Sequence, residues 1–178
     1  DAGEPQRFEV VPLREGGTLP RVAPSGLVAF NQEVAEMSRS LGGARRVIED
    51  AERRVGAIRQ VLDRSTVDDP SLRDAARTMD ARLADLRERL FGNPRRDMAN
   101  DSGPISVARR LEVVQFGTEY SLDGPTAMHR EVFGIAKRAY AELRDELNQL
   151  VTTDLPALEK QLEDVGVPWT PGRAVPIE

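Results

Sequence analysis

Apolar and alanine positions in the first half of the chain recur at spacings that alternate between three and four residues. A heptad pattern of this kind is typical of one long helix with a narrow apolar stripe, which needs another long helix to bury it. We therefore predict one continuous helix from about Ser25 to Arg64. The seam consists of Leu27, Phe30, Val34, Met37, Leu41, Ala44, Ile48, Ala51, Val55, Ile58 and Leu62.

Two glycines, Gly42 and Gly43, lie in the middle of this helix. Each costs about 1 kcal/mol relative to alanine in a helix interior. The seam nevertheless continues from Leu41 to Ala44 without a change of phase. We attribute the two glycines to the close approach of a neighbouring helix.

Helix start and stop signals divide the rest of the chain into three further helices. The second begins at Asp69-Pro70, because aspartate caps a helix and proline suits its first position. It ends at Gly92, since glycine commonly terminates helices. Its stripe is Leu72, Ala76, Met79, Leu83, Leu86 and Leu90. Residues 93–103 are polar and are predicted to form a loop. The third helix opens at Gly103-Pro104 and is expected to end at Gly117.

The fourth helix is the second long one, and it runs from Gly124-Pro125 to Gly166. Its apolar phase slips between Thr152 and Pro156. Because proline removes one backbone hydrogen bond and crowds the preceding turn, a kink or a capped restart is expected there. Gly166, followed by Val167-Pro168, is a C-terminal stop signal.

Helix lengths suggest a topology. At about 1.5 Å per residue, the first and fourth helices are each about 60 Å long, and the second and third together nearly match that length. The predicted fold is all-α, an elongated antiparallel bundle of three to four helices in three layers, with extended N- and C-terminal segments. Residues 1–24 form an extended linker or strand, residues 25–166 the bundle, and residues 167–178 the tail. A homodimer built on the long seam is the competing arrangement.

Composition agrees with slender helices. Hydrophobic residues make up 39% of the 178, aromatic residues 4% and charged residues 31%. A net charge of −5 argues against general attraction to nucleic acid. No apolar run approaches the ~18 residues of a membrane span. The chain has no cysteine, so its sequence leaves the redox compartment open.

No group of residues predicts a reaction. His129 is the single histidine, and Thr126 stands three residues before it, so the Glu-x-x-His motif of di-iron bundles is absent. A capping or surface role for His129 is the favoured interpretation. Paired carboxylates stand near arginines at helical spacing, which is ordinary surface pairing. We therefore expect no catalytic residue, no metal site, no cofactor and no enzymatic activity.

Three apolar side chains outside the seams are candidates for contact with a partner: Trp169, Phe8 and Val10. Trp169 is the only tryptophan and lies between prolines beyond the last helix. Its ring either folds back over the end of the bundle or docks onto a partner domain. Phe8 and Val10 belong to a short β-like run, Phe8–Val11, that cannot form a sheet alone.

Two parts of the chain carry a family resemblance. Arg7-Phe8-Glu9-Val10-Val11-Pro12-Leu13-Arg14 resembles the last strand of a propeller and its exit. Tyr140-Ala141-Glu142-Leu143, Asp154-Leu155-Pro156-Ala157-Leu158 and Asp164-Val165-Gly166-Val167-Pro168 resemble a helical tail. Together they are similar to the C-terminal region of large bacterial BNR-repeat proteins, the sortilin-like β-propellers often labelled glycosyl hydrolases. One departure is that Val11-Pro12-Leu13-Arg14 stands where an Asp-Pro-Arg-like exit is expected, which affects the register of the strand.

The resemblance implies that this chain is the C-terminal appendage of a propeller, secreted to the periplasm or the cell exterior. It would explain the isolated strand and the absence of a methionine at Asp1. It assigns no catalytic residue to this chain. The leading functional hypothesis is a non-catalytic bundle that docks to its own propeller, self-associates, or both. The alternative is an independent coiled-coil adaptor that binds a partner helix in a groove between its helices.

Overall fold

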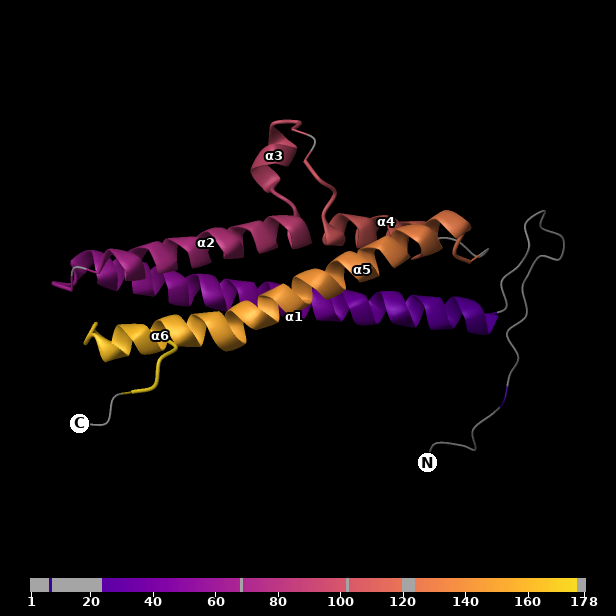
Figure 1. Ribbon diagram of the computed structural model, residues 1–178. Coiled ribbons are helices and arrows are strands. Elements are labelled where there is room, and N and C mark those ends of the chain that lie inside the picture. Colours follow the sequence, from indigo (N-terminus) through magenta and orange to yellow (C-terminus); the bar gives the residue numbers. More distant parts are fainter. Residues whose placement is uncertain (1–6, 8–23, 68, 102, 120–123, 176–178) are drawn as a thin grey trace, which may run out of the picture.

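The computed structural model describes residues 7, 24–67, 69–101, 103–119 and 124–175, and every regular element in these ranges is a helix (Figure 1). The all-α prediction is therefore confirmed. The elements are α1 (Pro24–Arg64), α2 (Pro70–Phe91), α3 (Pro94–Met98), α4 (Val107–Glu119), α5 (Ala127–Gln149), the π-helical turn η1 (Leu150–Asp154) and α6 (Leu155–Asp164). The expected strand at Phe8–Val11 lies outside the described residues.

The helices form an elongated bundle of three layers. Figure 1 shows α2 and α4 following each other along one side of α1. The elements α5, η1 and α6 form one long continuous helical rod that crosses α1 at an angle. The helix α1 packs against α2, α4 and α5, and α2 also packs against α5 and α6. This is the antiparallel topology expected from the helix lengths.

The long heptad seam is buried inside this single chain. Ten of its eleven residues have almost no exposed surface, and Leu27, the first, is half-buried. Ile48, Val55 and Ile58 are completely buried. Because the seam already faces the other helices of the same chain, the structure favours the single-chain bundle over the competing seam dimer.

Two expectations about glycines were wrong: the close approach of a helix at Gly42 and Gly43, and the end of a helix at Gly117. A Cβ atom added to Gly42 or Gly43 would have no heavy atom within 4 Å, so no neighbouring helix approaches there. Gly117 was expected to end the third helix, but α4 continues through it to Glu119. The missing side chain at Gly117 instead leaves room for the imidazole ring of His129 on α5.

The phase slip in the last long helix is a π-helical turn. Apolar residues of α5 are three or four positions apart up to Leu150, and the next buried residue, Leu155, follows after five. The backbone N–H of Leu155 donates to the Leu150 carbonyl, a bond that spans five residues and absorbs one inserted residue. The expected capped restart is absent, since no side chain caps the start of α6.

The stretch from 93 to 103 contains a helix that the polar composition did not predict. Pro94 occupies the first position of α3, where its missing N–H has no cost. The Asn93 side-chain oxygen accepts a hydrogen bond from the Arg95 backbone N–H at 3.1 Å, so this asparagine caps the short helix. The result is an ordered projection from the bundle between α2 and α4 (Figure 1).

Candidate interaction surfaces

His129 is a structural cap in this fold. Its backbone N–H donates to the Thr126 hydroxyl oxygen at 3.2 Å, and its Nδ1 accepts from the Thr126 backbone N–H at 3.3 Å. These two bonds close a capping box at the start of α5. The ring is buried against Gly117 of α4. The capping role predicted for His129 is therefore confirmed, and its ring also packs between α5 and α4.

Several carboxylates of the described residues form ion pairs between helices. No three acidic or histidine side chains in this part of the chain gather closely enough to hold a metal ion. Arg87 of α2 binds Glu52 of α1 with two hydrogen bonds, of 2.7 and 2.5 Å. Arg82 of α2 donates to Asp154 of η1 at 2.6 Å and lowers the pKa of that carboxyl. These pairs join the layers along the outside of the core.

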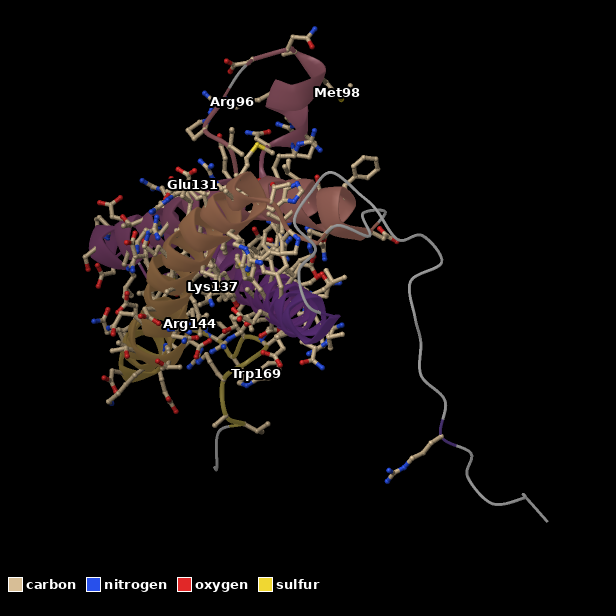
Figure 2. All side chains as sticks on the ribbon, turned by 90° about the vertical axis from the view of Figure 1, so that its right-hand side faces the viewer. Arg96, Met98, Glu131, Lys137, Arg144 and Trp169 are labelled. Carbon is tan, nitrogen blue, oxygen red and sulfur yellow. The ribbon has the colours of Figure 1, made fainter. Side chains whose placement is uncertain are left out.

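A projecting arm is the most distinctive surface feature. The arm comprises residues 93–101 and 103–105, with α3 at its centre, and it stands away from the bundle in both views (Figures 1 and 2). Met98 at the end of α3 is 87% exposed. Most of the arm's helix therefore has no contact with the core, and its order depends on bonds at its base.

Arg96 supplies those bonds. Its guanidinium donates to Glu88 of α2 at 2.7 Å and to Asp101 on the returning side of the arm at 2.9 Å. These two carboxylates raise the pKa of Arg96, the hydrogen bond to Glu88 having the larger effect. The Arg96 carbonyl also accepts from the Asp101 backbone N–H at 3.0 Å. One side chain thus holds both sides of the arm to the end of α2.

A cleft of about 820 Å³ lies between the arm and the adjoining ends of α2 and α4. Its polar wall includes the Arg96 pairs and, on α4, an ion pair of 3.0 Å between Arg109 and Glu112. Phe91, Pro104 and Ile105 contribute apolar surface. The cleft thus offers both apolar contact and charge to a docking chain. It is lined by Glu88, Phe91, Gly92, Asn93, Arg96, Asn100, Asp101, Gly103, Pro104, Ile105, Ser106, Arg109 and Glu112.

The tail, residues 167–175, folds back onto the bundle. Gly166 ends α6 in a left-handed conformation, with φ of +73°, and the Val167 N–H donates to the Leu162 carbonyl at 2.9 Å. Val167 and Thr170 are then buried. The C-terminal stop predicted at Gly166 is confirmed, but the segment after it is compact rather than extended.

Trp169 lies at the surface of this tail. The residue is 46% exposed, and its Nε1 donates to the Arg173 carbonyl at 3.1 Å. Figure 2 places it on the side of the bundle opposite the arm. The indole is thus anchored by its polar edge while half of its surface stays open. The other two candidate contact residues, Phe8 and Val10, lie outside the described residues.

An ion pair lies beneath the tail. Arg54 of α1 donates to both carboxylate oxygens of Glu159 on α6, with distances of 2.7 to 3.0 Å. Gly172, with φ of +98°, passes so close to Arg54 that a Cβ there would overlap the guanidinium. Both side chains are mostly buried. The tail therefore covers the contact between α1 and α6.

Sequence reasoning proposed Trp169 as a contact residue, and the structure shows it half-exposed, but sequence reasoning missed the arm. The signals were present, because Asn93-Pro94 is a helix start and Met98 is a large apolar residue in a polar stretch. The cleft could not be foreseen, since it forms only where α2, α3 and α4 meet.

Comparisons with protein-family models, curated proteins and solved structures find no match for this chain. Among the described helices, none combines the length and the apolar character that crossing a bilayer requires.

Proposed function

We propose that this chain is a non-catalytic helical bundle that acts in assembly. The observation that carries the proposal is the arm and the helix that follows it. Four of the ten large apolar side chains exposed in the described residues belong to the arm and α4. Exposed large apolar side chains grouped in one segment of the chain favour a protein–protein contact there. These residues are Met98, Ile105, Val113 and Phe116.

The proposed partner in the first instance is a β-propeller domain of the same protein, in the periplasm or outside the cell. The resemblance of residues 7–14 and of the helical segments to BNR-repeat proteins supports this partner. So does Trp169, because a half-exposed indole on a fixed tail supplies a large rigid apolar contact.

The experiment has two parts. The coding sequence upstream of Asp1 is read first, and propeller repeats there are the expected result. That upstream domain is then titrated into this chain while the emission of Trp169, its only tryptophan, is recorded. A blue shift that saturates supports docking through the tail. An upstream sequence without propeller repeats, or an emission spectrum that the domain leaves unchanged, contradicts it.

A second candidate function has its own observation. A shallow hollow of about 360 Å³ lies beside α1 and η1, lined by Arg46, Val47, Asp50, Ala51, Arg54 and Val151. Val47 is exposed there, and α1 has open space at Gly43 one turn earlier. These features fit an adaptor that binds an amphipathic helix. Binding of a labelled amphipathic peptide that Val47→Glu abolishes, and Val175→Glu does not, would favour this function.

A further inference from the structure

The arm and the cleft lie next to each other on one side of the molecule. The arm carries an almost fully exposed side chain, Met98, at its end, and the cleft is open beside its base. In Figure 2, Met98 and Arg96 are both labelled on the arm, which projects above the bundle. When two copies meet about a two-fold axis, the projection of each copy can enter the hollow of the other.

We infer that the arm of each chain enters the cleft of a second copy, so that two chains form a symmetric dimer. The contacting side chains from α3 of the arm are Met98 and Arg95, and those from the lining of the partner copy's cleft are Ile105 and Glu112. This inference rests on the proposed function in assembly, and it names a second copy of the chain as the occupant of that surface.

Charge favours a second copy in this cleft. The lining contains three carboxylates, of Glu88, Asp101 and Glu112, and two guanidiniums, of Arg96 and Arg109, which leaves one net negative charge. Arg95 on the arm is exposed, and its guanidinium takes part in none of the ion pairs of the described residues. The exposed guanidinium of Arg95 would thus meet a cleft whose lining carries one net negative charge.

Glu112 is the carboxylate best placed to receive Arg95. It lies on α4 at the outer part of the cleft, and its side chain is 59% exposed. Its pairing with Arg109 is a local contact between residues three apart, of the kind that contributes little in water. Glu88 and Asp101, by contrast, are both held by Arg96 at the base of the arm.

Shape and apolar chemistry also agree. The cleft volume of about 820 Å³ is within the range of sites that accommodate a ligand or several side chains. Phe91, Pro104 and Ile105 provide the apolar surface that an unbranched methionine can follow. Each contact occurs twice in a two-fold dimer, so it contributes twice to the free energy of dimerisation.

The bundle core would be untouched by this dimer. Ile48 and the other seam residues are buried within each chain, so association exchanges no helix and needs no unfolding. Substitutions in the arm should therefore change the dimer without changing the fold, which makes the inference testable by simple variants.

The experiment is sedimentation over a concentration series, with far-ultraviolet circular dichroism as a check on folding. The unaltered chain should show a reversible monomer–dimer equilibrium. Met98→Asp and Arg95→Glu should each raise the dimer dissociation constant about a hundredfold or more, because each change occurs twice in the dimer. Val175→Asp is the matched control, since Val175 is also largely exposed but belongs to the tail.

A charge exchange identifies the contact. Arg95→Glu and Glu112→Arg should each be monomeric alone, whereas an equimolar mixture should form mixed dimers because both ion pairs are then restored. An unaltered chain that is monomeric throughout, or a dimer that Met98→Asp and Arg95→Glu leave intact, overturns the inference. A monomeric chain that still shifts its Trp169 emission with the upstream domain would overturn only the second-copy contact and would leave the proposed function standing.

Discussion

Gly117 offers the sharpest test of the packing between α4 and α5. It lies inside α4, where alanine would ordinarily stabilise a helix by about 1 kcal/mol over glycine. A Cβ at this position would overlap Nε2 of His129 and would lie 2.7 Å from Cε1 of the same ring. The clash with His129 therefore opposes the higher helix propensity of alanine. The sign of the change in the free energy of unfolding depends on which of the two is larger.

The His129 ring has little freedom to move aside. It is buried, and its Nδ1 accepts a hydrogen bond from the Thr126 N–H at 3.3 Å as part of the capping box. Overpacking of a buried site costs about 1–3 kcal/mol, and loss of a helix cap about 1 kcal/mol more. After the gain of about 1 kcal/mol from helix propensity, Gly117→Ala should lower the free energy of unfolding by about 1–3 kcal/mol.

Urea unfolding followed by circular dichroism at the helical band measures this change. Gly42→Ala and Gly43→Ala are the controls, because a Cβ at either position meets nothing within 4 Å. Each should raise the free energy of unfolding by about 1 kcal/mol. In a His129→Ala background the ring is absent, so Gly117→Ala should then stabilise by a similar amount.

Opposite signs for the same substitution are the decisive result. If Gly117→Ala stabilised the chain as much as Gly42→Ala does, the ring of His129 would not occupy the space beside Gly117. If Gly117→Ala remained destabilising without the ring, the cost would come from the backbone of α4 and not from packing. Either outcome would refute the account of the α4–α5 contact.

Three further predictions concern the core, the ion pair beneath the tail and the response to acid. Ile48→Asp places an unpaired charge at a fully buried seam position and should unfold the chain at every protein concentration, as circular dichroism would show. Glu159→Ala leaves the mostly buried Arg54 without its partner and should cost about 3–5 kcal/mol in urea unfolding, whereas the double variant Arg54→Met/Glu159→Leu should recover most of that loss. The hydrogen bond from Arg82 lowers the pKa of the Asp154 carboxyl in the folded chain, so the unfolded chain binds a proton at this carboxyl more readily. The stabilisation from the ionised Asp154 is therefore complete above about pH 4 and should be lost as the pH falls through the lower pKa of the folded state. Asp154→Asn should therefore reduce the dependence of stability on pH below about pH 4, and an unchanged dependence would contradict that role.

Much of the fold could be predicted because the information is local and repeated. The seam of α1 returns every three or four residues, so an error at one position leaves the helix assignment intact. The start at Asp69-Pro70 was also predictable, since the Asp69 carboxylate accepts from the Ser71 N–H at 2.9 Å, as a cap does. Local signals of this kind place helices but do not place their neighbours.

Glycine shows where local reasoning fails. Gly117 and Gly42 look alike in sequence, yet the first is filled by a ring from α5 and the second faces open space. The difference depends on His129, which belongs to another helix. The same limit applies to the slip between Leu150 and Leu155, because a spacing of five fits a kink, a restart or a π-turn equally well.

The candidate surfaces were less predictable than the fold. The sequence predicts Trp169 as a contact residue because it is a lone large side chain, but its half-exposed position depends on the turn at Gly166 and on the bond from its Nε1 to the Arg173 carbonyl. The polar composition of residues 93–103 predicts a loop, and the helix start at Asn93-Pro94 is easily overlooked because it directly follows the stop at Gly92. The cleft required the packed ends of two helices and had no sequence signal.

The positions of the two proposed surfaces determine what an assembly of this chain can do. The seam is buried internally, so association must use surfaces outside it, and the arm and the tail provide them. Both views show the arm on one side of the bundle and the tail on the other (Figures 1 and 2). A second copy bound at the arm would therefore leave Trp169 accessible to another domain. If both proposals hold, the bundle would join two copies of whatever domain its tail binds, and loss of Met98 would separate those copies without releasing either domain from its own tail.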